Sequence, residues 1–159
     1  MLIRNISDLP ALLEKGQTLL GLDYGSKAIG VAVSDPALSI ASPLATITRK
    51  KFPADAQKLA ALMEERNAGA LVLGLPRNMD GSEGATAQAA RAFARNFEKY
   101  LKPRDLPVAF WDERLSSAAV ERFMIEDNMS RKRRDEVIDK AAAAYILQGA
   151  LDALRHMRG

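Results

Sequence analysis

The stretch LLGLDYGSKAIGVAVSD, residues 19–35, decides the fold. Two short runs of aliphatic and β-branched residues stand on either side of Gly25-Ser26-Lys27, and this spacing predicts two antiparallel strands joined by a tight turn. The first run ends on a carboxylate, Asp23, although a buried strand needs no charge there. An aspartate beside a turn can simply hydrogen-bond its own backbone. Asp23 therefore has to be judged together with the other acids of the chain.

The remaining sequence predicts a mixed α/β fold. Strands are expected at residues 18–24, 28–34, 44–49, 70–75 and 107–111, and helices at residues 54–67, 85–101, 117–126 and 136–155. The first three strands are expected to form an antiparallel meander, whereas the last two are entered through helices and run parallel. The sequence thus predicts a mixed five-stranded sheet flanked by helices. We expect a single domain over residues 1–159, with an N-terminal extension at residues 1–16.

Composition excludes several classes of site. The chain of 159 residues has no cysteine and one histidine, His156. Disulfides and thiolate zinc sites are therefore impossible, and a Ser/His hydrolase or a histidine-bound zinc centre is disfavoured. No segment approaches the roughly 18 consecutive apolar residues that a membrane span needs, and the first residues lack the pattern of a signal peptide. We expect a cytoplasmic protein with no membrane partner.

Three places combine carboxylates with expected strand ends or helix starts. Asp23 ends the first strand, Asp112 and Glu113 follow the fifth, and Asp139 lies near the start of the last helix. Each has an ordinary explanation alone: a turn residue, a surface charge, or an acid at the positive end of a helix. Neighbouring parallel strands, however, deliver their carboxyl ends to one edge of the sheet. A helix packed across the sheet can then bring Asp139 to the same cleft.

Such a cluster of acids predicts a divalent metal site. Clustered carboxylates without a metal repel one another, and their oxygen atoms favour Mg²⁺ or Mn²⁺ over zinc. Two such ions about 3.5–4 Å apart suit phosphodiester hydrolysis. We predict Asp23, Glu113 and Asp139 as metal ligands and catalytic residues. Asp112 stays an alternative catalytic acid, because successive strand residues point to opposite faces and Glu113 is longer and nearer the strand's exit.

The basic residues are unevenly placed, although the formal net charge is only +3. Clustered bases suit the phosphate backbone of a nucleic acid. The predicted nucleic-acid contacts are Lys27, Arg77, Arg114, Arg131, Lys132, Arg133, Arg134 and Lys140. A second basic run, Arg49-Lys50-Lys51, has two interpretations, a phosphate contact or a solvated loop.

Four motifs together resemble those of the YqgF/RuvX family of pre-16S ribosomal RNA nucleases, once described as Holliday-junction-resolvase-like. The motifs are GLDYGSKAIGVAVSD, LVLGLPRNMDGSEG, DERLSSAAVERF and DEVIDKAAAAYILQGAL, which span residues 20–151. The resemblance implies an RNase H-like fold and a metal-dependent endonuclease that matures the 5′ end of small-subunit ribosomal RNA. It also implies that Asp23, the Asp112-Glu113 pair and Asp139 are the functional acids.

Two positions depart from this resemblance. The family's first motif usually carries an arginine where this chain has Ala28, with Lys27 beside it, which implies a lost or moved phosphate contact. The exit of the fourth strand, residues 74–78, has no acid, although related nucleases of this fold commonly place one there. The metal site must then draw on Glu113 or Asp112, or weakly on Asn78.

Three other functions share parts of this pattern. A DNA Holliday-junction resolvase needs the same metal chemistry, and a non-catalytic RNA-binding ribosome-assembly factor could keep the fold and the bases. Sugar kinases, actin and heat-shock ATPases begin with a similar Asp-x-Gly hairpin but need two such domains. The expected partners are a ribosomal RNA precursor or another structured nucleic acid, and the small ribosomal subunit. The expected oligomeric state is a monomer or weak homodimer.

Overall fold

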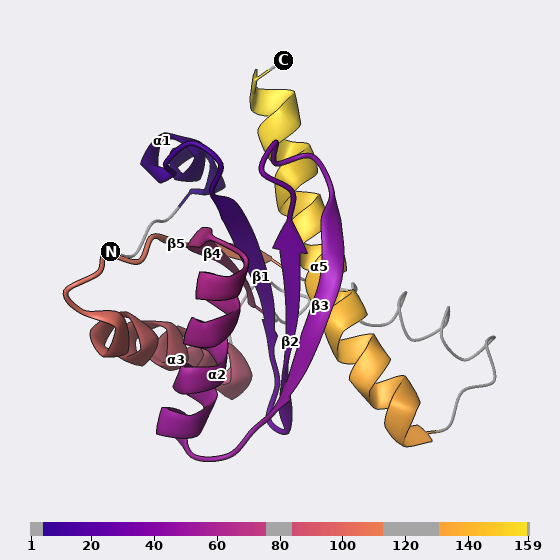
Figure 1. Ribbon diagram of the computed structural model, residues 1–159. Coiled ribbons are helices and arrows are strands. Elements are labelled where there is room, and N and C mark those ends of the chain that lie inside the picture. Colours follow the sequence, from indigo (N-terminus) through magenta and orange to yellow (C-terminus); the bar gives the residue numbers. More distant parts are fainter. Residues whose placement is uncertain (1–4, 76–83, 113–130, 159) are drawn as a thin grey trace.

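The structure, a computed structural model, describes residues 5–75, 84–112 and 131–158 (Figure 1). At its centre is a five-stranded sheet in the order β3-β2-β1-β4-β5. Neighbours within β1, β2 and β3 are antiparallel, whereas β1, β4 and β5 run parallel. The predicted mixed sheet is confirmed, and β1 is its central strand. The strands are β1 (Thr18–Tyr24), β2 (Ala28–Ser34), β3 (Ala41–Thr48), β4 (Ala68–Leu75) and β5 (Val108–Asp112).

Helices cover both faces of this sheet. Figure 1 shows α2 and α3 on one side and α5 running across the other. Within the three described ranges, no helix is both long and apolar enough to cross a bilayer. The described helices are η1 (Ile6–Asp8), α1 (Leu9–Leu12), α2 (Phe52–Glu65), α3 (Ala85–Leu101) and α5 (Arg131–Arg158).

The central strand β1 divides its side chains between two cores. Leu20, Leu22 and Tyr24 pack in the core beneath α2 and α3, whereas Leu19 packs in the core beneath α5. Burying one leucine side chain stabilises the fold by roughly 1.5–3 kcal/mol, and a slip of one residue would exchange the two faces. The alternation therefore places Asp23 on the α5 face of the sheet.

Several predicted elements agree with the structure, and some of the differences have local causes. The strands at 18–24 and 28–34 and the helix at 85–101 are confirmed with their bounds. β4 begins two residues early because Asn67, with φ 53°, ends the turn after α2 in a left-handed conformation. The strand expected at 44–49 is β3, which spans Ala41–Thr48. The N–H of Ala41, at its start, donates to Oε1 of Gln148 on α5 at 2.8 Å.

The remaining differences are shifts of a few residues at element ends. The helix expected at 54–67 spans Phe52–Glu65, the strand expected at 107–111 spans Val108–Asp112, and the helix expected at 136–155 spans Arg131–Arg158. The helix expected at 117–126 lies outside the described residues.

Asp35 organises the connection between β2 and β3. Its Oδ1 accepts hydrogen bonds from the backbone N–H of Ser39 at 2.7 Å and of Ile40 at 3.0 Å, and its Oδ2 accepts one from the Ser39 hydroxyl at 2.7 Å. The bond from Ile40, helped by those from Ser39, lowers the pKa of Asp35 to about 2. Gln148 of α5 also donates to the Ser39 carbonyl at 3.0 Å. This connection is therefore tied to α5.

We predict that Asp35→Asn destabilises the protein at neutral pH but not in strong acid. The folded pKa lies below the ordinary value of 3.8, so the ionised carboxylate contributes stability above about pH 4. That contribution is lost as the pH falls through about 2. The difference at pH 7 should be about 1 kcal/mol or less, because solvent screens a partly exposed carboxylate. Denaturant unfolding of both proteins at pH 7, 4 and 2 measures it, and an equal difference at pH 7 and pH 2 would contradict it.

Candidate active site

Asp23 lies near the carboxyl end of the central strand, between two glycines. Its partner across the antiparallel β1–β2 pair is Gly30, and its partner across the parallel β1–β4 pair is Gly74. Neither neighbour carries a side chain, so the sheet on both sides of this carboxylate is bare backbone. Asp23 is partly buried, whereas Leu22 and Tyr24 beside it are buried. Asp23 thus lies one residue from the end of the central strand, with bare backbone beside it on both sides.

The backbone of α5 lies directly over Gly30. A Cβ atom at this position would overlap the carbonyl oxygen of Asp139 and would lie 3.0 Å from the backbone nitrogen of Lys140. Residues directly opposite each other in an antiparallel pair project to the same face. The side chain of Asp23 therefore projects to the same sheet face on which the backbone of Asp139 crosses β2.

A second glycine, Gly21 in β1, shows that this close approach of α5 to the sheet continues along the helix. A Cβ atom at Gly21 would lie 2.7 Å from the Cβ of Leu147 and 3.1 Å from the carbonyl oxygen of Ala143. Gly21 and Asp23 share a face of β1. The glycine of β1 and that of β2 thus let α5 descend close to the sheet, and the acid lies at one end of this contact.

A pocket of about 280 Å³ opens beside Asp139. Its walls are the β1–β2 turn and the part of α5 that contains Asp139. Lys27, one of the predicted nucleic-acid contacts, is exposed at this turn and lines the pocket. The pocket thus joins a carboxylate and a flexible cation at one mouth. The lining residues are Gly25, Ser26, Lys27, Ala28, Ile138 and Asp139.

The acids at the end of β5 are separated by the sheet alternation. Asp112 pairs with Leu75 of β4, and Leu75 faces the core beneath α2 and α3. Phe110, two residues earlier, packs against the same core. Asp112 therefore belongs to the face opposite Asp23, and its side chain is exposed. Glu113 lies outside the described residues.

The described donors suit a hard cation but are fewer than the predicted set. Asp23 and Asp139 offer carboxylate oxygen atoms, which Mg²⁺ and Mn²⁺ prefer. Within residues 5–75, 84–112 and 131–158, no group of three or more His, Asp and Glu residues gathers where it could hold a metal ion. Since the predicted third ligand, Glu113, lies outside those ranges, the three-acid site stays a prediction.

The predicted basic contacts are placed unevenly by the structure. Lys140 is partly buried, one residue after Asp139. The backbone of Arg131, Lys132, Arg133 and Arg134 forms the first turn of α5, and their side chains are not among the described ones. Arg77 and Arg114 lie outside the described residues. Lys27 lines the same pocket as Asp139, and Lys140 adjoins Asp139 in the chain.

Sequence reasoning missed why Gly30 matters. The sequence shows only a glycine in the second strand, whereas in the structure Gly30 is the contact point for the α5 backbone. A turn of three residues, Gly25 to Lys27, already fixes Gly30 opposite Asp23. The spacing of the hairpin was therefore the signal, but the helix that needs the glycine could not be identified from it.

We predict that Gly30→Ala lowers the free energy of unfolding by roughly 1–3 kcal/mol, the usual cost of overpacking. Alanine would ordinarily improve a strand by about 0.5–1 kcal/mol relative to glycine, so the sign of the change is diagnostic. The added methyl group meets a backbone carbonyl, which cannot move away by changing rotamer. Gly84→Ser is the control, because a Cβ at Gly84 meets nothing within 4 Å. Denaturant unfolding measures both, and a stabilised Gly30→Ala protein would contradict the contact.

Comparison with known proteins identifies the family of this chain. The family model RuvX, described as Holliday junction resolvase, matches residues 17–153. A relative from Roseobacter denitrificans named pre-16S rRNA nuclease is 56% identical over 99% of this chain and 96% of its own length. A relative of the same name from Rhodospirillum centenum is 58% identical over 98% of this chain and 84% of its own length.

Solved structures share the fold at low sequence identity. RuvC of T. thermophilus, in complex with a Holliday junction substrate, has a TM-score of 0.51 at 11% identity, over 88% of this chain and 96% of that chain. The yeast mitochondrial Holliday junction resolvase Ydc2 has a TM-score of 0.51 at 13% identity, over 96% of this chain and 85% of that chain. The fold is thus RNase H-like, as the sequence resemblance implied. Given the family match and relatives more than half identical over nearly its whole length, this chain belongs to the RuvX family.

Proposed function

We propose that this chain is a divalent-metal-dependent endonuclease that hydrolyses RNA and processes the 5′ end of pre-16S ribosomal RNA. The observation that supports the proposal is that Asp23, near the carboxyl end of the central strand, pairs with Gly30, over which the backbone of Asp139 passes. Ligands of open α/β sheets bind at the carboxyl ends of the strands. Relatives more than half identical are named pre-16S rRNA nuclease, which supports this substrate.

The chain's own acids would hold the metal ions. Asp23 and Asp139 supply oxygen ligands from the strand and from the helix, and Glu113 is the proposed third ligand. Bound Mg²⁺ or Mn²⁺ would supply a water of lowered pKa and stabilise the charge that develops on the phosphate. Asp23 is fixed by its strand and the backbone of Asp139 by its contact with Gly30. The ligands are therefore positioned before substrate arrives, which is where most of the benefit of such a site arises.

The basic residues of the same mouth would position the RNA backbone. Lys27 lines the pocket on the turn, and Lys140 follows Asp139 on α5. Lys27 sits beside Ala28, where the family usually has arginine, and would supply the phosphate contact from the neighbouring position. A flexible ammonium group binds phosphate as a point charge rather than through a planar fork. We infer a cytoplasmic enzyme that meets its substrate on the small ribosomal subunit, as a monomer or weak homodimer.

A DNA junction resolvase is the second candidate. It is favoured by the description of the matching family model, Holliday junction resolvase. The acids and the metal chemistry would be the same for either polymer, so the substrate has to be decided by direct comparison. A non-catalytic assembly factor would keep the basic residues and have no use for the converging acids.

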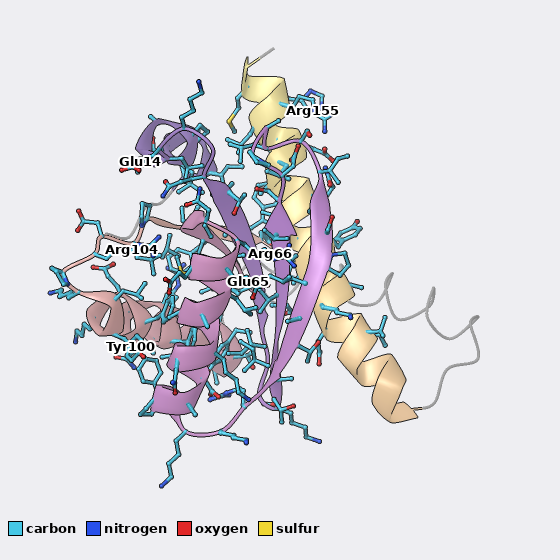
Figure 2. The ribbon with its side chains drawn as sticks, viewed as in Figure 1. Glu14, Glu65, Arg66, Tyr100, Arg104 and Arg155 are labelled. Carbon is cyan, nitrogen blue, oxygen red and sulfur yellow. The ribbon has the colours of Figure 1, made fainter. Side chains whose placement is uncertain are left out.

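We predict that Asp23→Asn and Asp139→Asn each lower the cleavage rate at least about 100-fold, because even outer groups of metal sites cost roughly 10–100-fold. The matched control is Asp152→Asn, an exposed acid of α5 that pairs with Arg155 at 2.8 Å. Figure 2 shows Arg155 toward the C-terminal end of α5, away from the β1–β2 turn. Asp152→Asn should keep the wild-type rate, and a chelator should abolish cleavage until Mg²⁺ or Mn²⁺ is restored.

The substrates for this measurement are a pre-16S RNA fragment, an unrelated single-stranded RNA and a four-way DNA junction. We expect the precursor to be cut fastest. Faster cutting of the junction would replace the proposed substrate with the second candidate. Wild-type rates in Asp23→Asn would refute the acid site, and binding without cleavage by the wild type would favour the assembly factor.

A further inference from the structure

Arg49, the first residue of the basic run after β3, donates hydrogen bonds to the turn between β1 and β2. Its backbone N–H donates to the carbonyl oxygen of Lys27 at 2.9 Å. Its Nη1 donates to the carbonyl oxygen atoms of Gly25 at 3.2 Å and Ser26 at 3.3 Å. All three successive carbonyl groups of the turn are thus bonded by one residue. Within the turn itself, the Gly25 N–H donates to the Ala28 carbonyl at 2.9 Å.

The guanidinium of Arg49 lies against an aromatic ring, and the residue is partly buried. Its Cζ lies 4.6 Å from the centre of the Tyr24 ring, a cation–π contact. Tyr24 is only 7% exposed, and its ring lies 5.1 Å from that of Phe93 on α3. The Nε of Arg49 is buried without a hydrogen-bond partner. Among the described residues no carboxylate forms an ion pair with this arginine, so its charged hydrogen bonds go to the turn.

The corner that follows Arg49 is fixed by a buried acid. Asp55 of α2 is 2% exposed, and its Oδ1 accepts a hydrogen bond from the Lys50 N–H at 3.0 Å. This bond holds the backbone one residue after Arg49, while the side chains of Lys50 and Lys51 are exposed. The three bases of the run therefore differ: one is built into the fold, and the other two are free to meet solvent or phosphate.

The turn held by Arg49 is a wall of the candidate active site. Gly25, Ser26 and Lys27 line the pocket that also contains Asp139. Tyr24, under the guanidinium, directly follows Asp23, and the two side chains project from opposite faces of β1. Arg49 thus acts on the far face of the strand end whose near face carries the carboxylate.

We propose that Arg49 is a positioning residue of this site. Acting through the turn, it holds the end of β1 and Lys27 in the geometry that cleavage requires, without touching the substrate. The proposal rests on the proposed nuclease function. Displacing a catalytic constellation by about 1 Å can lower a rate by about 100-fold. Loss of Arg49 should accordingly reduce the rate of the bound complex and leave substrate affinity nearly unchanged.

A pocket next to Arg49 offers a way to test this by chemical rescue. It has a volume of about 260 Å³, and Tyr24, Phe52, Asp55 and Asn96 are among its lining residues. Removing the arginine side chain would join its space to this pocket. A small guanidinium compound could then enter from solvent and bond the same carbonyl groups.

The experiment compares Arg49→Ala with two controls. Lys50→Ala removes a neighbouring charge without touching the turn. Arg104→Ala removes another arginine that donates to a backbone carbonyl, that of Ala68 at 2.6 Å, and Figure 2 shows Arg104 away from the β1–β2 turn. We expect kcat for pre-16S RNA to fall about 10–100-fold in Arg49→Ala, with KM within about threefold, and ethylguanidine to restore part of the loss. Neither control should show this pattern.

Several outcomes would overturn the proposal. An unchanged kcat, a rise in KM alone, or the same effect in Lys50→Ala would make Arg49 a phosphate contact or a neutral residue. If Arg49→Ala fails to fold, Arg49→Lys keeps one donor nitrogen and the charge but loses the planar fork, and should also lower kcat more than it raises KM.

A measurement without RNA separates this proposal from the proposed function. Amide hydrogen exchange at Gly25, whose N–H closes the turn, should accelerate about tenfold or more in Arg49→Ala and stay unchanged in Arg104→Ala. Unchanged hydrogen exchange at Gly25 would refute the claim that Arg49 holds the β1–β2 turn in place. If the wild type cleaves no substrate while exchange at Gly25 is faster in Arg49→Ala, the nuclease function is refuted. The stabilisation of the turn by Arg49 would still hold.

Discussion

The arrangement of the molecule depends on how closely the backbone of α5 approaches the central sheet. Glycines at positions 21 and 30 leave no Cβ between helix and strands, so the carbonyl of Asp139 rests where the Gly30 side chain would otherwise lie. In the same ladder Gly30 is the partner of Asp23. The absence of a methyl group at Gly30 therefore sets how closely the backbone of Asp139 approaches the strand pair that carries Asp23. The energy that enforces it comes from the apolar residues farther along α5, which are buried against the sheet.

The central strand carries a carboxylate, Asp23, whose burial would destabilise the fold. A carboxylate in the middle of a buried sheet would lose its hydration at great cost. Asp23 avoids this because it lies one residue from the strand's end and stays partly exposed. Leu22 and Tyr24, next to it in sequence, anchor the strand in the opposite core. The acid is therefore held by its neighbours' burial rather than by its own.

The basic run after β3 shows that charge alone does not identify a contact with nucleic acid. The sequence gives no reason to distinguish Arg49 from Lys50 and Lys51. In the structure, Arg49 packs against the Tyr24 ring and donates hydrogen bonds to backbone carbonyl groups, whereas the two lysines are exposed. Arginine suits the enclosed position because its planar group can stack on a ring while its N–H groups reach separate acceptors. Lysine suits the exposed positions because its ammonium group is strongly hydrated.

The sequence by itself determined the two strands of the central hairpin, because alternation with period two and the hairpin spacing are local properties of the chain. It also determined that the sheet combines antiparallel and parallel strands, and its four motifs identified the family. It also predicted Asp23 and Asp139 as site residues from an expected strand end and an expected helix start, although α5 begins eight residues before Asp139, at Arg131. The tertiary structure alone decided that Gly30 receives the backbone of α5, that Asp112 belongs to the opposite face from Asp23, and that Arg49 turns inward. These three facts depend on which distant surface packs against each residue, and no local pattern encodes that choice.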